Sequence, residues 1–397
     1  MTYPDETAEE AVAEVVSAAA ELISARFGGQ PVLSDPEILS GQSDALVVRV
    51  RVGVNPFLPH RSIVVKRIAK TGEGSEPAML REVVAYQFAN TLPDEARPGP
   101  ELLAYDISQR LLVLSDSGVV DTLADILANG DEEQRLRSFR ALGAALGKMH
   151  IQTHHREDGF ETLRRRVWAK GGVERESIYA RDRGIVSAIR FGIRAFEGSG
   201  LEVPDAVRSF AGDAARRIEK GTHRAFTPFD LAPDNILMAD KVQFLDYDWA
   251  GYRDVLFDVA SVVAGFPLHV FVTRPSRAEV EAFIRSWTEE IRDHWYRATD
   301  ERRLLAFIAA ALVGWLFISA TIAYFGSPER ALSFDSETAA NEEPTVGGPA
   351  LVLRDMANTA RAVAEFAEHC EDERADQLRD FAIKVIAYLE SGEELAQ

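Results

Sequence analysis

Alternating apolar residues predict strands in the first third of the chain. Between residues 38 and 53, Leu46 and every second residue up to Val52 are apolar, with two arginines among the residues between them. A period of two predicts a strand with one buried face. The run SIVVKRI, residues 62–68, follows a loop with two prolines and predicts a hairpin partner. RLLVLSD, residues 110–116, predicts a further short strand.

Helical periodicity dominates the rest of the chain. Thr7 and Glu10 stand at capping-box spacing before an alanine-rich helix over residues 7–27, and MLREVVAYQFANTL predicts another helix after the hairpin. Beyond the third strand, helical patterns prevail to the end. We therefore predict an α+β fold: a small β-rich N-terminal lobe, residues 1–115, followed by a large, mainly α C-terminal lobe, residues 116–397.

One helical segment is long and apolar enough to cross a bilayer. LLAFIAAALVGWLFISATIAYFGS, residues 304–327, contains no charged residue. Its isolation, its acidic flanks and its many small residues favour a helix that is packed on all sides inside the helical lobe. A buried core helix is the preferred interpretation, with a membrane span as the alternative.

Charge and cysteine content narrow the classes of partner. With 44 basic and 63 acidic residues the formal net charge is -19, so a sequence-independent grip on nucleic acid or on an anionic membrane surface is not expected. Cationic or neutral small molecules are the easier partners. The single cysteine, Cys370, rules out an internal disulfide and favours a reducing compartment. No export signal is recognised at the N-terminus, and we expect a cytoplasmic protein.

Acidic residues crowd into PFDLAPDNILMADKVQFLDYDW, residues 228–249. Asp230 and Asn235 lie on either side of Pro233, which favours a loop, and Asp246 ends a short predicted strand. Taken singly, such residues commonly cap turns. Brought together, the carboxylates would repel unless their pKa values rise or a cation joins them. An oxygen-only set of carboxyl and amide groups suits Mg²⁺.

The same stretch resembles a known family. DLAPDNIL, FLDYDWA and FDVA, which begin at residues 230, 244 and 257, together resemble the aminoglycoside phosphotransferase family, which is similar to choline, homoserine and fructosamine kinases. The resemblance is tight over residues 225–262 and loose over 38–120. It implies a protein-kinase-like bilobal fold, with Asp230 as the catalytic aspartate and Asn235 and Asp246 as Mg²⁺ ligands. Asp258 is expected to bond the catalytic-loop backbone.

The resemblance also implies a nucleotide site in the N-terminal lobe. Lys66 stands where the family has its phosphate-binding lysine, and Glu82 where it has the helical ion-pair partner. The Ser-Gly turn with Gly41 and Ser43 would cover the phosphates, although a single glycine makes this signal weak. Ser115 would lie in the hinge that meets adenine. A fixed positive charge for phosphates, held by an anchoring carboxylate, is the physical requirement that the Lys66–Glu82 pair would meet.

The chain departs from the family pattern at one position. The family usually has a histidine two residues before the catalytic aspartate, where it braces the loop, and here that position is Pro228. Its loss puts the loop geometry and the rate in question more than metal binding. His150, in GKMH, matches a helical histidine of these kinases, and we interpret it as structural.

These residues predict transfer of the γ-phosphoryl group of ATP, or of GTP, to a hydroxyl of a small molecule, with Mg²⁺. One alternative is a protein of the same fold that binds nucleotide or a partner without transfer. A hydrolase with Asp230 and Asp246 as paired carboxylates is a second, but it gives Lys66, Glu82 and Asn235 no role. The sequence leaves the acceptor open among an amino sugar, a macrolide and a metabolite alcohol. It also leaves open whether the protein confers antibiotic resistance or has a metabolic role.

Overall fold

The computed structural model describes residues 5–39, 45–68, 75–269, 273–295, 300–333 and 344–396. Its contacts divide the chain into two compact units. Unit 1 comprises Met1–Val120, Gly159–Arg175 and Gln243–Trp249, and unit 2 comprises Asp121–Asp158, Glu176–Val242 and Ala250–Gln397. The sequence analysis divided the chain near residue 115. Unit 1 extends slightly further and also includes two short segments from later in the chain.

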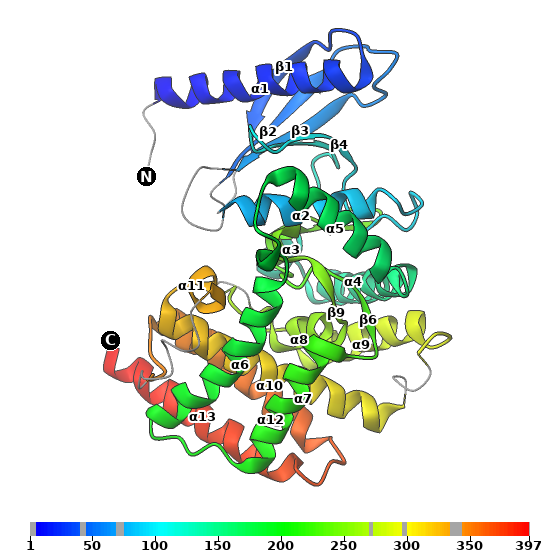
Figure 1. Cartoon of the computed structure of the whole chain (residues 1–397). Helices are drawn as coiled ribbons and strands as arrows, with labels where there is room; N and C mark the ends of the chain where they lie inside the picture. Colours follow the sequence, from blue (N-terminus) through cyan, green and yellow to red (C-terminus); the bar gives the residue numbers. More distant parts are fainter. Residues whose placement is uncertain are drawn as a thin grey trace. The chain divides into compact units, whose positions relative to one another are not determined.

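Unit 1 is built on a five-stranded antiparallel sheet with the order β1-β2-β3-β5-β4 (Figure 1). The strands are β1 (Leu33–Ile38), β2 (Ala45–Val52), β3 (Ser62–Ile68), β4 (Leu102–Asp106) and β5 (Leu111–Ser115). The hairpin and the third strand predicted from alternation are confirmed as β2, β3 and β5, whereas β1 and β4 were not predicted. Apolar residues of α1 (Asp5–Phe27) pack on the sheet and form one core with it.

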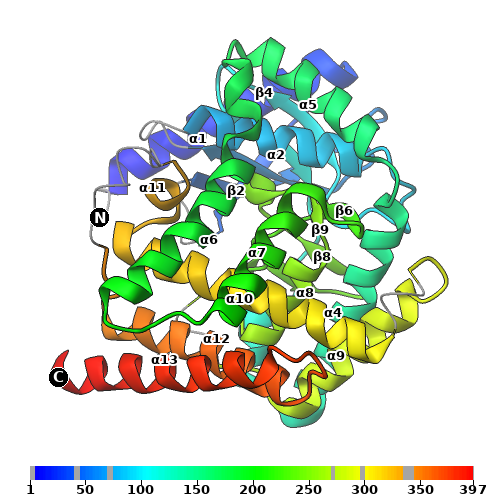
Figure 2. The same cartoon turned by 60° about the horizontal axis from the view of Figure 1, so that its bottom comes forward.

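Two further helices belong to unit 1. The helix predicted after the hairpin is α2 (Ser75–Ala89), and α5 (Glu157–Gly171) lies beside it in Figures 1 and 2. Phe88 and Phe160 join them, with ring centroids 5.3 Å apart in an edge-to-face arrangement. The segment Gln243–Trp249 contains most of β8 (Val242–Phe244) and the 3₁₀ turn η3 (Tyr247–Trp249), which packs against α2.

Unit 2 is mainly helical, as predicted for the C-terminal part of the chain. It begins with α3 (Leu123–Asn129) and α4 (Glu132–Thr153) and continues through α6 (Ala180–Gly198) and α7 (Asp205–Lys220). The 3₁₀ turn η1 (Arg175–Tyr179) precedes α6. The remaining helices are α8 (Leu256–Ala264), α9 (Arg277–Ile291), α10 (Glu301–Phe325), α11 (Pro328–Ser333), α12 (Ala350–Glu368) and α13 (Ala375–Ala396).

A short irregular region interrupts these helices. The strands β6 (Arg224–Thr227) and β9 (Gly251–Asp254) pair antiparallel. Between them in sequence come the 3₁₀ turn η2 (Pro233–Asn235) and β7 (Ile236–Met238). The predicted loop around Asp230 and Asn235 lies here. The combination of an antiparallel sheet in unit 1 and a helical unit 2 confirms the predicted α+β fold class, with a small β-rich part and a large helical part.

The apolar helix is α10, and unit 2 buries it. Among the described residues it is the one helix whose length and composition would allow it to cross a membrane, yet 83% of its most apolar window is buried. It packs against α6, α7, α8 and α12 (Figure 2). Its Trp315 Nε1 donates a hydrogen bond of 2.9 Å to the carbonyl of Phe257 in α8. The apolar surface of α10 is thus buried against neighbouring helices, in agreement with the preferred interpretation of a core helix.

Candidate active site

Three predicted site residues meet in unit 1. Lys66 Nζ lies 2.9 Å from Oε1 of Glu82 and 2.8 Å from Oδ1 of Asp246, although these residues are 16 and 180 positions away in sequence. Lys66 is 9% exposed and Glu82 is completely buried. Lys66 comes from β3 and Glu82 from α2. The ammonium group is therefore held between two carboxylates, one in the interior and one at a partly exposed position.

Close packing holds Asp246 in place. The backbone amide of Phe244 donates to the carbonyl of Pro98 over 2.8 Å. A Cβ atom on Gly99 would lie 2.4 Å from the carbonyl oxygen of Phe244 and 2.7 Å from the Tyr247 hydroxyl, so this approach requires glycine. Two residues after Asp246, the carbonyl of Asp248 accepts a hydrogen bond of 2.8 Å from Nε of Arg81 in α2. The strand end that carries Asp246 is thus fixed to unit 1 by several contacts.

Burial and charge oppose each other in this cluster. Burial alone would lower the pKa of Lys66, but the charges of Glu82 and Asp246 outweigh it and the pKa is raised, so the ammonium stays protonated. Burial raises the pKa of Glu82 to about 7, in spite of the Lys66 charge. Among the described residues, Oε2 of Glu82 is buried with no hydrogen-bond partner. The carboxylate therefore holds Lys66 through a single oxygen.

Asp246 is a partly exposed carboxylate at an unusual backbone position. Its backbone φ of +54° is in the left-handed region, which is uncommon for a residue other than glycine and is a feature that clusters at functional sites. Its side chain is 26% exposed, and its hydrogen bond to Lys66 uses Oδ1. A carboxylate oxygen is a donor that Mg²⁺ accepts. Asn235, the other predicted ligand, lies half-buried in η2 of unit 2.

Asp230 is held by a strained turn in unit 2. Its backbone amide donates to the carbonyl of Pro228 over 2.8 Å, and the residue between them, Phe229, has φ of +66°. An i to i+2 bond around a positive φ is the rare, strained form of γ-turn. The amide of Phe229 donates over 3.2 Å to Oδ1 of Asp258 at the start of α8. The expectation that Asp258 bonds the catalytic-loop backbone is confirmed.

A buried chain of hydrogen bonds holds Asp258 in turn. Trp287 of α9 donates from Nε1 to Nδ1 of His150 over 3.0 Å, and Nε2 of His150 lies 3.2 Å from Oδ2 of Asp258. Because Nδ1 accepts, Nε2 carries the proton that it donates to the carboxylate. Both His150 and Asp258 are completely buried. His150 is structural, as interpreted from the sequence.

The sequence analysis missed one residue of this site. Nε2 of His269 lies 3.0 Å from Oδ1 of Asp230, so a histidine from the segment after α8 contacts the predicted catalytic carboxylate. Burial lowers the pKa of His269, but the hydrogen bond and charge of Asp230, together with the charges of Asp234 and Asp355, raise it overall. A single histidine in AGFPLH gave no signal in the sequence, because only the tertiary fold brings it to Asp230.

The remaining predicted nucleotide-site residues are Ser115, Gly41 and Ser43. Ser115 ends β5, and its Oγ accepts a hydrogen bond of 2.9 Å from the amide of Glu101. Gly41 and Ser43 lie outside the described residues. Lys66, Glu82 and Asp246 meet in unit 1, whereas Asp230 and Asn235 belong to unit 2. The meeting of all five around one nucleotide stays a prediction.

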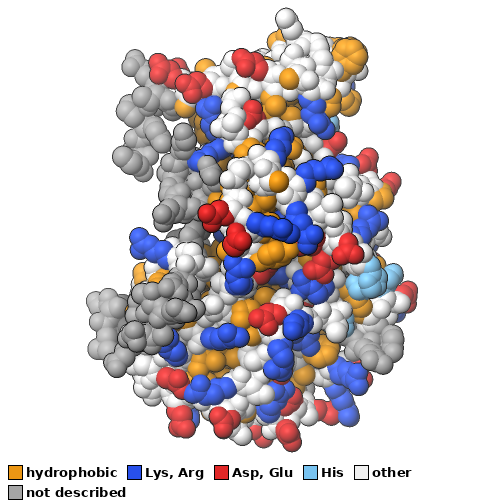
Figure 3. Space-filling view, in the orientation of Figure 1, with side chains coloured by type: hydrophobic (Ala, Val, Ile, Leu, Met, Phe, Trp, Pro, Cys, Tyr) orange, Lys and Arg blue, Asp and Glu red, His pale blue; other side chains and the backbone are white. Residues whose placement is uncertain are grey.

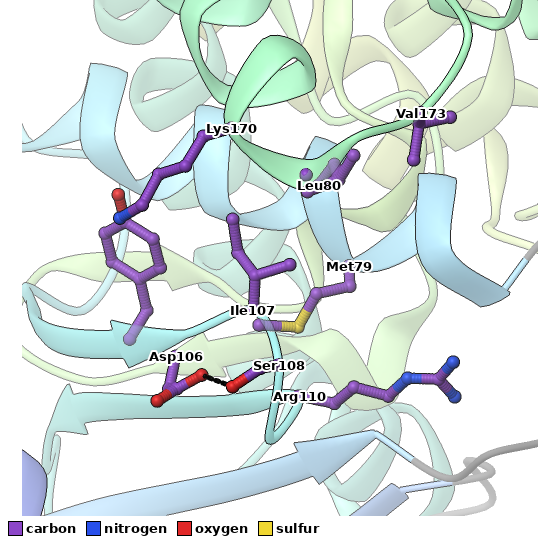
Figure 4. Close-up of a pocket in the computed structure, with 10 residues that line it drawn as sticks. Met79, Leu80, Asp106, Ile107, Ser108, Arg110, Lys170 and Val173 are labelled. Atoms are coloured by element: carbon purple, nitrogen blue, oxygen red, sulfur yellow. Dashed lines mark hydrogen bonds between the residues drawn. The ribbon is translucent and has the colours of Figure 1, made fainter.

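A pocket of about 590 Å³ also lies in unit 1, but it does not include the lysine cluster (Figure 4). Its lining comes from α2, from the turn between β4 and β5, and from the end of α5: Met79, Leu80, Tyr105, Asp106, Ile107, Ser108, Arg110, Lys170, Gly171 and Val173. A hydrogen bond of 2.6 Å from Ser108 to Asp106 shapes its edge. On the face drawn in Figure 3, acidic and basic side chains are interspersed despite the acidic net charge.

Solved structures of related shape are distant in sequence. A choline/ethanolamine kinase family protein from Mesorhizobium loti is 16% identical, with a TM-score of 0.48, and the match covers 94% of this chain and 98% of that one. Choline kinase LicA from Streptococcus pneumoniae is 12% identical, with a TM-score of 0.45 and coverage of 88% and 98%. The streptomycin-ATP-APH(2")-IIa ternary complex is 12% identical, with a TM-score of 0.46 and coverage of 85% and 99%.

Sequence comparison gives the family directly. No curated protein matches the chain significantly. The profile of the Phosphotransferase enzyme family, APH, matches residues 37–305, which contain every predicted site residue. This span covers more than half of the chain and confirms the resemblance noted from the three motifs. The chain belongs to the phosphotransferase enzyme family.

Proposed function

We propose that this protein is an ATP-dependent small-molecule kinase that transfers the γ-phosphoryl group to a hydroxyl of its acceptor. The observation that carries the proposal is the contact of Lys66 with both Glu82 and Asp246. A buried lysine with two carboxylates brought from distant segments has a clear use in phosphoryl transfer, where a fixed positive charge must meet phosphate oxygens. GTP is the alternative donor.

Lys66 would orient the phosphates. Its ammonium group remains protonated, and Glu82 fixes its position from the interior. A phosphate oxygen that approaches Nζ would take the third hydrogen of the ammonium group, since the two carboxylates use the other two. The same lysine can therefore keep its anchor while it contacts the nucleotide.

Asp246 and Asn235 would hold Mg²⁺. The donor set fits the ion, because both side chains offer oxygen and the Asp246 carboxylate is partly exposed. When bound, Mg²⁺ supplies positive charge that neutralises phosphate oxygens. The Asp246 carboxylate would then contact both the Lys66 ammonium group and the metal ion.

Asp230 would act on the acceptor. Its carboxylate would accept a hydrogen bond from the attacking hydroxyl and take the proton as the new oxygen–phosphorus bond forms. The bond between the γ-phosphorus and the bridging oxygen breaks, and its electron pair leaves on the ADP. The turn at Phe229, tied to Asp258, would keep Asp230 in place during this step.

The acceptor is proposed as a small hydroxyl-bearing molecule. The acidic chain suits a cationic or neutral compound better than an anionic one. A coupled assay of ATP consumption tests this with a panel of aminoglycosides, amino sugars, macrolides and metabolite alcohols, with ATP or GTP and with Mg²⁺ or chelator. We expect acceptor-dependent turnover that needs Mg²⁺.

A matched pair of variants makes the assay specific. Lys66→Ala should abolish most turnover, whereas Lys170→Ala, an exposed lysine of unit 1, should leave it unchanged. Nucleotide binding without transfer to any acceptor would instead support a binding protein of the same fold. Pro228, in place of the usual histidine, and the predicted turn with a single glycine at Gly41 are the observations that keep this second candidate in view.

A further inference from the structure

His269 contacts Asp230 in a way that leaves part of the carboxylate free. Oδ1 of Asp230 accepts from His269 Nε2 at 3.0 Å and from the amide of Ala232 at 3.2 Å. The Asp230 side chain is 30% exposed. Both hydrogen bonds recorded among the described residues thus go to one oxygen, and Oδ2 is the oxygen that remains for an acceptor.

We propose that His269 is a positioning residue that fixes the carboxylate of Asp230 by holding Oδ1, so that Oδ2 receives the proton of the acceptor hydroxyl. This inference rests on the proposed function. It gives the loop a side-chain brace in place of the histidine that the chain lacks at position 228. Correct orientation of a reacting group is worth large factors in rate, and a misplacement of about 1 Å can cost about a hundredfold.

The backbone that presents His269 supports the inference independently. Gly265, Phe266 and Leu268 have φ of +94°, +61° and +78°, so two residues other than glycine lie in the left-handed region within this turn. Such conformations are unfavourable and persist where the surroundings impose them. The buried Asp355 of α12 accepts the amide of Leu268 over 2.9 Å. The strain has an evident result, because the turn delivers the imidazole to Asp230.

Among the described residues, the charges that act on His269 are acidic. The charges of Asp230, Asp234 and Asp355 and the hydrogen bond to Asp230 together raise its pKa, although burial opposes this. The neutral form with a proton on Nε2 keeps the hydrogen bond, whereas the imidazolium form adds a positive charge beside the carboxylate that is to receive the proton. The rate should therefore rise as the pH passes the raised pKa of His269.

Two substitutions distinguish a positioning role of His269 from a role in protein stability alone. His269→Ala removes the donor and should lower kcat about ten- to a hundredfold, with KM for ATP nearly unchanged. His269→Gln carries an amide N–H at a similar reach and should recover most of kcat, but without the rise of kcat around the His269 pKa. His294→Ala, at an exposed histidine of unit 2, is the control and should behave as wild type.

A titration by NMR adds a readout that needs no turnover. The His269 pKa in wild type should exceed its value in Asp230→Asn, because that substitution removes an opposite charge within hydrogen-bond distance. An unchanged His269 pKa, or an active enzyme in which His269→Ala keeps the kcat of His294→Ala, would overturn the inference alone. A wild type that transfers phosphate to no acceptor would overturn the proposed function as well.

Discussion

Two buried carboxyl groups, those of Glu82 and Asp355, have few hydrogen bonds to offset their loss of water. Glu82 is completely buried and holds Lys66 through one oxygen, and burial raises its pKa to about 7. Asp355 is 7% exposed and accepts one backbone hydrogen bond, and burial raises its pKa to about 6. Glu82 contacts Lys66, and Asp355 interacts electrostatically with His269. The desolvation of both carboxyl groups is a cost that the fold bears.

Asp355 gives a pH-dependent prediction. Its pKa is raised from an ordinary 3.8 to about 6, so the folded chain binds this proton more tightly than the unfolded chain does. The contribution of Asp355 to stability is then full at low pH and is lost as the pH rises through this interval. Asn cannot titrate, and its side-chain oxygen can still accept the amide of Leu268.

The measurement compares wild type with Asp355→Asn. We expect the unfolding free energy of the variant to gain on wild type by roughly 1 to 3 kcal/mol as the pH rises from about 4.5 to about 7.5. Denaturation in urea at several pH values gives this difference, in which titrating groups that do not interact with Asp355 cancel. A difference that does not change with pH would show that the carboxyl is not desolvated.

At the scale of elements, glycines allow α4 and α9 to approach closely. A Cβ atom on Gly143 would lie 2.3 Å from the carbonyl oxygen of Phe283, and one on Gly147 would lie 2.6 Å from the Cβ of Glu290. This close packing places Trp287 of α9 within reach of His150 on α4. The hydrogen bonds that lead through Asp258 to the catalytic loop thus depend on helix packing.

Gly143→Ala should push the two helices apart, because the obstacle is backbone rather than a flexible side chain. We expect a loss of stability of about 1 to 3 kcal/mol. Turnover should also fall, since Trp287 no longer holds His150. Gly212→Ala in α7 is the matched control: its Cβ would meet only the end of the Arg216 side chain at 3.5 Å, and alanine should stabilise that helix by about 0.5 to 1 kcal/mol.

Thermal unfolding and kcat of both variants provide the check. Equal melting temperatures for Gly143→Ala and Gly212→Ala would contradict the role assigned to the close contact of α4 and α9. A stable Gly143→Ala protein with unchanged kcat would contradict the dependence of the catalytic loop on the packing of α4 against α9.

At the scale of the whole molecule, local patterns revealed much of the fold. Alternation predicted β2, β3 and β5, and helical periodicity predicted the helical character of unit 2 and the burial of α10. These elements bury a face or stripe that is visible in the sequence itself. The strand β1, with the sequence LSDPEI, was missed because polar residues dominate it and it lies mostly exposed.

Contacts between distant segments were predictable only where a motif signalled them. The family resemblance implied the pairing of Lys66 with Glu82, and the structure brings Asp246 to the same lysine. The contact of His269 with Asp230 left no local signal. The assignment of residues 159–175 and 243–249 to unit 1 was also beyond sequence patterns, because it follows from packing on α2 and around Gly99.

The central claim assigns separate roles to Asp230 and Asp246, and a rapid-quench measurement of γ-phosphoryl transfer tests it most directly. With ATP binding measured in parallel, Asp230→Asn should bind Mg²⁺-ATP as wild type does but transfer phosphate at least about tenfold more slowly. Asp246→Asn should instead lose affinity for Mg²⁺-ATP. Transfer at the wild-type rate by Asp230→Asn, or equal activity of the two variants, would contradict the account.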